Sequence, residues 1–260
     1  MATILDTIIA SKRREIDDSR KLRPEASLRD RLPQAPPVRD FFTPLAAGKP
    51  IRLIAEVKKA SPSKGVIRED FDPVEIALTY ERHGATCLSV LTDSPFFQGS
   101  LENLSRIRRA VSLPLLRKDF ILEAYQVYEA RLAGADAVLL IAECLDDCQL
   151  RGLHNLIVEL GMTPLVELYE PANLNRVFDA GATLIGINNR DLRTFEVDLA
   201  HSIAFRPLVP DQCVLVAESG IRGRADAIWL EDAGIDAMLV GETLIAHPDI
   251  GAAVDALLGK

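Results

Sequence analysis

Four ionisable side chains, Glu56, Lys58, Lys118 and Glu167, stand where short apolar runs of the sequence end. A lysine ammonium polarises or protonates a carbonyl oxygen and a carboxylate accepts a proton, so this set is suited to general acid–base catalysis. Burying several charges together costs free energy unless they pair, and such clusters gather where a pKa must be tuned. Two ion pairs that only stabilise the rim of the fold are the competing interpretation.

Strand periodicity predicts which polar residues face the interior, because side chains of a strand alternate sides. Counting in twos along each run places one set on the inner side: Glu56, Lys58, Lys118, Phe120, Glu167, Asn188 and Ser219. Ser219 is assigned from the side of Leu215 and Ala217. Gly186, two residues before Asn188, leaves room beside it.

Two glycine turns follow the last two runs, Glu218-Ser-Gly-Ile221 and Val240-Gly-Glu-Thr243. Backbone N–H groups in such turns bind phosphate, and Gly220 and Gly241 would let the backbone approach it closely. Arg190 adds a positive charge to the same corner. The turns therefore indicate a phosphate site, with ordinary turn glycines as the alternative.

Eight apolar, β-branched runs recur from residue 51 onward, with helical patterns between them: 51–57, 86–91, 114–118, 136–141, 163–168, 183–187, 213–217 and 237–240. One helical pattern, 73–84, ends at Gly84 as a C-cap. Eight strand–helix units predict the α/β class and a (β/α)8 TIM barrel, whose active site lies at the carboxyl ends of the strands. A doubly wound open sheet is the alternative, but it usually carries a G-x-G-x-x-G turn, which this sequence lacks.

Residues 1–50 differ from the rest and predict an N-terminal helix and loop extension to a barrel of residues 51–260, within one domain of residues 1–260. Apolar residues fall mostly on one helical face: Ile4, Leu5, Ile8, Ile9 and Ile16. Lys12 falls elsewhere on that helix, and a long Pro-rich loop leads to Phe41 and Phe42.

The formal net charge of −8 disfavours binding to nucleic acid or to an anionic membrane. No stretch approaches a membrane span or a signal peptide, so we expect a cytoplasmic protein. The cysteines form no C-x-x-C pair, and neither a metal-ligand constellation nor a cofactor fingerprint appears, so we expect no metal and no cofactor. Trp229 is expected in the core.

The segment Glu56-Val-Lys-Lys-Ala-Ser-Pro-Ser-Lys-Gly65 closely resembles the strand-1 signature of the indole-3-glycerol-phosphate synthase family. Further segments resemble family motifs in the right order: Leu91-Thr-Asp93 with Phe97-Gln-Gly-Ser100, Leu116-Arg-Lys-Asp-Phe120, Leu165-Val-Glu167, Gly186-Ile-Asn-Asn-Arg-Asp-Leu192, Ala217-Glu-Ser-Gly-Ile221 and Leu239-Val-Gly-Glu242. The resemblance covers nearly the whole chain, including the N-terminal helix.

The resemblance implies a carboxy-lyase of tryptophan biosynthesis that converts 1-(2-carboxyphenylamino)-1-deoxyribulose 5-phosphate into indole-3-glycerol phosphate, releasing CO2 and water. By family position Lys118 is the general acid for ring closure, and Lys58 contacts the anthranilate carboxylate. Lys58, Glu56 and Glu167 are available for the later acid and base steps, and their division of roles stays open.

The resemblance assigns Asn188 to a substrate hydroxyl and Ser219 to the same catalytic set. It also implies contacts to substrate and phosphate from Ser61, Phe120, Leu139, Arg190, Gly220, Gly241 and the backbone of Glu242. For Phe120 and Leu139, core packing is the alternative. The partner expected is a small phosphosugar, with no nucleic acid and no membrane. We expect a monomer or weak homodimer, in contact with other tryptophan-pathway enzymes.

Three other functions compete with this interpretation. Phosphoribosylanthranilate isomerase usually needs Cys and Asp at strand ends, where this chain has Glu and Lys. A class I aldolase would form a Schiff base on a strand-end lysine, which borohydride traps. A non-catalytic barrel that binds sugar phosphates would need no complete acid–base set, and such a set is present at Lys58, Lys118 and Glu167.

Overall fold

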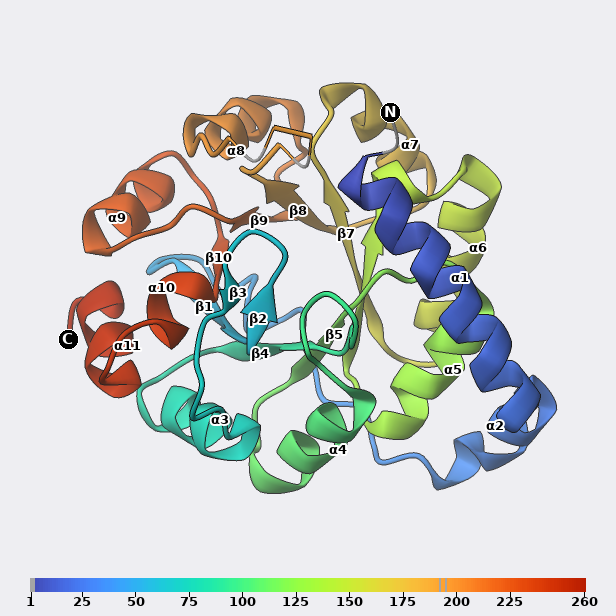
Figure 1. Ribbon diagram of the computed structural model, residues 1–260. Helices are drawn as coiled ribbons and strands as arrows, with labels where there is room; N and C mark the ends of the chain where they lie inside the picture. The colour runs from blue at the N-terminus through green and yellow to red at the C-terminus, as the bar shows by residue number, and fades with distance from the viewer. Residues whose placement is uncertain (1–2, 192, 195) are drawn as a thin grey trace.

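A computed structural model describes residues 3–191, 193–194 and 196–260 of the chain, so Leu192, the end of one motif, lies outside the described residues. Eight parallel strands close into a barrel in the order β1-β10-β9-β8-β7-β6-β5-β4 (Figure 1). The strands are β1 (Arg52–Val57), β4 (Cys87–Leu91), β5 (Leu115–Lys118), β6 (Ala137–Ile141), β7 (Thr163–Leu168), β8 (Leu184–Asn188), β9 (Val214–Glu218) and β10 (Ala237–Val240). The predicted TIM barrel is confirmed, and every predicted strand is found with its ends within one residue.

Helices surround the barrel and cover its outer face (Figure 1). They are α3 (Pro73–Arg82), α4 (Leu101–Ala110), α5 (Ala124–Ala133), α6 (Asp147–Glu159), α7 (Leu174–Asp179), α8 (Ala200–Phe205), α9 (Arg224–Asp232), α10 (Glu242–Ile245) and α11 (Ile250–Leu258). After β1 the chain forms a small antiparallel hairpin of β2 (Ala60–Ser61) and β3 (Gly65–Val66). Among the described residues, no helix is both long and apolar enough to cross a membrane.

Local sequence explains where these helices start and stop. Asp72 caps α3 by accepting hydrogen bonds from the backbone N–H groups of Val74 and Glu75. The helix ends at Arg82, two residues before the predicted Gly84, which follows with a φ of +92°. Glycine adopts that left-handed conformation without a steric penalty, so it turns the chain toward the next strand.

The apolar side chains form two layers on either side of the strands. The inner layer fills the barrel and contains Ile54, Leu116, Leu139, Leu165, Leu184, Val214, Val216 and Leu239. Leu215 and Ala217 belong instead to the outer layer, between strands and helices. The side predicted for the end of β9 was therefore wrong: the inward residue is Glu218, and Ser219, with a φ of +67°, lies in the turn after the strand.

Part of the N-terminal segment closes the barrel at the amino ends of the strands. Its helices are α1 (Ile4–Leu22) and α2 (Glu25–Arg31), followed by one turn of 3-10 helix, so the predicted long loop is shorter than expected. Phe41 and Leu45 are fully buried in the inner layer. The Sγ of Cys87, the first residue of β4, lies 3.8 Å from the Phe41 carbonyl oxygen. Phe41 and Leu45 therefore plug the barrel at the amino ends of the strands.

Trp229 does not lie in the core, contrary to expectation. It is 48% exposed on α9, whose buried residues are Ala227 and Leu230. The helix turns these two residues toward the barrel, and Trp229 falls between them on the opposite face. An indole placed one residue from a buried position is thus directed outward by helical periodicity.

If Phe41 and Leu45 plug the barrel, the same leucine-to-alanine change should affect the free energy of unfolding very differently at two positions. Leu45→Ala opens a cavity at a fully buried position and is expected to lower the free energy of unfolding by about 2–5 kcal/mol. Leu22→Ala removes the same atoms from a side chain that is 88% exposed and should change it by less than about 0.5 kcal/mol. Urea denaturation measures both, and equal effects would show that residue 45 does not plug the barrel.

Candidate active site

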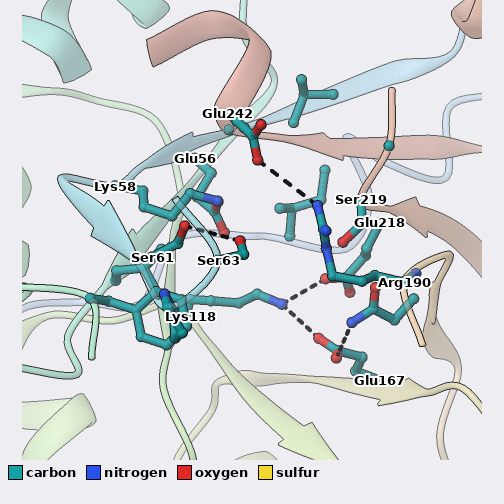
Figure 2. Close-up of a pocket in the computed structure, with 18 of the residues that line it drawn as sticks. Glu56, Lys58, Ser61, Ser63, Lys118, Glu167, Arg190, Glu218, Ser219 and Glu242 are labelled. Atoms are coloured by element: carbon teal, nitrogen blue, oxygen red, sulfur yellow. Dashed lines mark hydrogen bonds and ion pairs between the residues drawn. The ribbon is translucent and has the colours of Figure 1, made fainter. Parts of the chain in front are cut away.

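A cavity of about 510 Å³ opens at the carboxyl ends of the strands (Figure 2). Every residue that the sequence analysis assigned to the site lines it: Glu56, Lys58, Ser61, Lys118, Phe120, Leu139, Glu167, Asn188, Arg190, Ser219, Gly220, Gly241 and Glu242. Its volume falls within the range of small-molecule sites. The structure thus brings the whole predicted set together in one cavity.

The centre of the cavity is an ammonium held between two carboxylates. Lys118 Nζ lies 2.6 Å from Glu167 Oε2 and 2.6 Å from Glu218 Oε2. Figure 2 shows the lysine reaching between them. Sequence reasoning missed Glu218 because it counted the strand from Leu215 and Ala217. Counting from Val214 and Val216 would have found it.

Burial and mutual repulsion separate the pKa values of these three groups. Burial alone would lower the pKa of Lys118, but the charges of Glu167 and Glu218 outweigh it and raise that pKa above its ordinary value. Burial opposes ionisation of Glu167, yet Lys118 and the amide of Asn188 lower its pKa. Burial, reinforced by the charge of Glu167, raises the pKa of Glu218 to about 8. At neutral pH Glu218 is therefore the carboxyl that retains a proton.

A second ion pair lies at the carboxyl end of β1. Lys58 Nζ lies 2.5 Å from Glu56 Oε2, and both side chains are largely buried. A Cβ on Gly241, in the turn after β10, would lie 2.3 Å from that Glu56 oxygen, so this turn has room for the carboxylate only because residue 241 is glycine. Glycine at 186 does the same for Glu218, since a Cβ there would lie 2.3 Å from Glu218 Oε1.

Asn188 links the charged centre to the predicted phosphate corner. Its Nδ2 donates a hydrogen bond to Glu167 Oε1 at 3.0 Å. Its Oδ1 accepts one from the backbone N–H of Arg190 at 3.0 Å. One amide thus fixes the orientation of a carboxylate and the start of the loop that carries an arginine.

Cations and glycine turns converge at that corner. The Glu242 carboxylate lies 3.5 Å from Lys64 Nζ and 3.9 Å from Arg190 Nη2. Gly220 has a φ of +82°, which a side chain would strain. Lys64 and Arg190 thus both lie beside the Glu242 carboxylate, and this concentration of positive charge suits an anion. A backbone role alone was predicted for Glu242, and the structure adds a side chain paired with both cations.

The opposite wall of the cavity is apolar. Phe120 and Leu139 line it together with Phe97, whose ring centroid lies 6.2 Å from that of Phe120. Three residues of α1 complete this wall: Ile4, Leu5 and Ile8. The sequence pattern predicted an apolar face on this helix but gave no sign that the face reaches the cavity, because periodicity does not show what a helix packs against.

Cysteine and histidine take no part in this arrangement. All four cysteines are unpaired by disulfides, and Cys87 and Cys213 are buried away from solvent. Across residues 3–191, 193–194 and 196–260, no group of three or more His, Cys, Asp or Glu side chains is arranged to hold a metal ion. The polar side chains that line the cavity supply ammonium, guanidinium, carboxyl, amide and hydroxyl groups.

The raised pKa of Glu218 predicts a pH-dependent stability. The folded state holds this proton more tightly than the unfolded chain, whose glutamate titrates near 4.5. The resulting stabilisation is complete below about pH 4.5 and is lost as the pH rises through about 8. In urea denaturation, Glu218→Gln should remove this fall in the free energy of unfolding with rising pH. Glu102→Gln, at an exposed ion pair, should retain it. A fall that persists unchanged in Glu218→Gln would contradict the assignment.

Solved structures with low sequence identity share the barrel. A 3-hexulose-6-phosphate synthase from Salmonella typhimurium aligns with a TM-score of 0.66 and 13% identity, over 80% of this chain and 96% of that one. Another 3-hexulose-6-phosphate synthase aligns with a TM-score of 0.62 and 16% identity, over 80% of this chain and 99% of that one. At such identities the likeness shows the fold alone.

Sequence comparisons are more specific. The family model described as "Indole-3-glycerol phosphate synthase" matches residues 5–257. The indole-3-glycerol phosphate synthase of Rhodopirellula baltica is 54% identical over 258 residues, 99% of this chain and 100% of that protein. The protein of that name from a Polaromonas species is 49% identical over 263 residues, 100% of this chain and 99% of its own length. With its barrel, its charged cavity and matches along its full length, the chain belongs to the indole-3-glycerol phosphate synthase family.

Proposed function

We propose that this chain closes the indole ring, converting 1-(2-carboxyphenylamino)-1-deoxyribulose 5-phosphate into indole-3-glycerol phosphate with release of CO2 and water. The observation that carries the proposal is the Lys118 ammonium, 2.6 Å from each of two carboxyl groups inside the cavity. An apolar wall lies on one side of it and a cationic, glycine-rich corner on the other. A substrate with an aromatic ring, a central carbonyl and a terminal phosphate matches this order.

Ring closure forms a carbon–carbon bond between the aromatic ring and the ribulose carbonyl carbon, whose π electrons move to oxygen. We assign Lys118 to polarise this oxygen and protonate it. Because the pKa of Lys118 is raised, its positive charge is in place before the substrate reacts, which is electrostatic preorganisation. Glu218, with a pKa of about 8, is a proton donor matched to neutral pH and lies within hydrogen-bonding distance to replenish the lysine.

Decarboxylation then breaks the bond between ring carbon and carboxylate, and its electron pair returns to the ring system. The new hydroxyl takes up a proton and leaves as water while a base removes a proton from the ring system. We assign Lys58 to the carboxylate and to the second acid step. Glu56 and Glu167 are the bases available, and the lowered pKa of Glu167 favours it because that carboxylate is ionised at neutral pH.

The remaining side chains bind and orient. We assign Asn188 and Ser219 to substrate hydroxyls near the reacting carbon, and Phe120 and Leu139 to the aromatic ring. The phosphate would contact Ser61, Arg190, Gly220, Gly241 and the backbone of Glu242. In this arrangement the phosphate displaces the Glu242 carboxylate from Lys64 and Arg190, since all three groups meet at one corner.

The cellular setting is also a proposal. We propose a cytoplasmic enzyme of tryptophan biosynthesis that acts on a free phosphosugar, without nucleic acid or membrane. The net charge of −8 supports the absence of a general polyanion surface. We further propose a monomer or weak homodimer that contacts other enzymes of the pathway.

The central experiment mixes the protein with the carboxyphenylamino-deoxyribulose phosphate and follows indole fluorescence. Wild-type protein should produce a fluorescent product, and Lys118→Ala should lose turnover by about 10²- to 10⁴-fold while still binding product, since the general acid is gone. Lys49→Ala, which removes an exposed lysine paired with Asp232, is the control and should keep full activity. A folded wild type without product would refute the function, and near-normal turnover in Lys118→Ala would refute the acid.

The phosphate corner gives a second, separable prediction. Arg190→Gln should raise KM by about 10- to 100-fold, the effect of losing a charge-assisted hydrogen bond, with a smaller change in kcat. Inorganic phosphate should also become a weaker competitive inhibitor. Arg193→Gln, the same change on the exposed part of the same loop, should alter neither value. Equal inhibition of Arg190→Gln and wild type by phosphate would place the phosphate elsewhere.

A further inference from the structure

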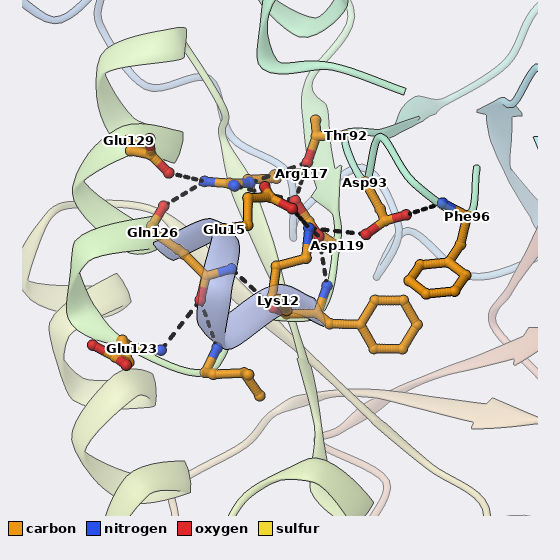
Figure 3. Close-up of polar contacts among 12 residues, drawn as sticks. Lys12, Glu15, Thr92, Asp93, Phe96, Arg117, Asp119, Glu123, Gln126 and Glu129 are labelled. Atoms are coloured by element: carbon orange, nitrogen blue, oxygen red, sulfur yellow. Dashed lines mark hydrogen bonds and ion pairs between the residues drawn. The ribbon is translucent and has the colours of Figure 1, made fainter. Parts of the chain in front are cut away.

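A lysine of the N-terminal helix is buried in a cluster of carboxylates (Figure 3). Lys12 is 1% exposed, and its Nζ lies 2.9 Å from each of Glu15 Oε2, Asp93 Oδ2 and Asp119 Oδ1. The helical pattern had placed Lys12 off the apolar face. Since a buried ammonium costs several kcal/mol unless it is paired, these ion pairs hold that turn of α1 in one place.

The cluster continues into the strand that carries Lys118. Asp119 Oδ2 accepts hydrogen bonds from Thr92 at 2.6 Å and from Arg117 at 3.1 Å. Asp119 Oδ1 accepts one from the backbone N–H of Phe120 at 2.8 Å. Asp119 thus stands between the central lysine of the cavity and an aromatic residue of its wall, and Lys12 binds α1 to that point.

The same helix forms part of the cavity wall. Ile8 and Leu5 precede Lys12 by four and seven residues, which is the spacing of one helical face, and both line the cavity with Ile4. Figure 1 shows α1 along the side of α5 and α6, away from β9 and β10, whose turns form the phosphate corner. Beyond the cluster, a further ion pair joins partly exposed Arg20 of α1 to Glu123, the residue before α5.

We propose that Lys12 is a positioning residue: its ion pairs with Asp93 and Asp119 hold α1 over the cavity, so that Ile4, Leu5 and Ile8 cover the aromatic half of the substrate. This inference rests on the proposed function, because it takes the substrate to have an aromatic half. Lys12 itself touches no reacting atom. Without it Arg117 and Thr92 still hold Asp119, so the strand end that carries Lys118 keeps its place.

The test is Lys12→Met, which keeps most of the apolar stem and removes the charge. It should raise KM, and the inhibition constant of anthranilate, by about 10- to 100-fold, the effect of losing the contact of an aliphatic side chain. It should change kcat by less than about threefold and leave inhibition by inorganic phosphate unaltered. Lys21→Met, which removes an exposed lysine of the same helix paired with Asp18, should match wild type.

A second variant guards against unfolding. Lys12→Met with Asp93→Asn removes both charges and leaves no unpaired carboxylate at residue 93, yet should show the same rise in KM. Hydrogen exchange should increase in residues 4–16 and stay slow in the barrel strands. Unchanged KM and exchange would overturn the proposal, as would a loss of kcat, phosphate inhibition and strand protection together. If wild type itself forms no product, the proposed function fails. Two measurements, hydrogen exchange of residues 4–16 and the affinity for anthranilate, then still decide the role of Lys12.

Discussion

The contact of one ammonium with two carboxyl groups is the constraint on which the rest of the site depends. Lys118, Glu167 and Glu218 come from β5, β7 and β9, which are alternate strands of the barrel. In a closed barrel of this kind, the inward side chains of alternate strands share a layer. The strands between them carry apolar residues or glycine at this level. Gly186 on β8 has no side chain, and Glu218 occupies the volume that a Cβ would fill. Barrel closure, strand register and one glycine thus act together to create a single charged triad.

The triad has one positive charge for two carboxyl groups in a place that water scarcely reaches. We therefore expect one carboxyl to keep a proton. Burial raises the pKa of Glu218 to about 8, and its Oε1 has no hydrogen-bond partner among the described residues, so Glu218 is the carboxyl that we expect to hold it. A fixed ammonium and a nearby protonated acid are what ring closure onto a carbonyl requires. The same arrangement costs folding free energy, because charges are withdrawn from water. The plugged amino end of the barrel and its two apolar layers offset that cost.

Much of this could be predicted from sequence, since strands and glycine turns are local signals. The eight runs fixed where the strand ends lie, and hence which polar residues meet. Errors arose where the decisive contact is distant in sequence. Lys12 is buried by carboxylates 81 and 107 positions further along the chain, which no helical pattern shows. Glu218 was missed because both faces of β9 are apolar, so the sequence does not show which face points into the barrel.

The central claim is that Lys118 stands ready as an ammonium. Nitrogen-15 NMR of protein labelled at lysine Nζ measures this directly, with the Lys118 signal identified as the one missing from Lys118→Arg. We predict that it remains an ammonium at every pH at which the protein functions and titrates, if at all, above the ordinary lysine value of 10.5. A signal of neutral amine at about pH 7 would contradict the account, because Lys118 would then be a base or nucleophile.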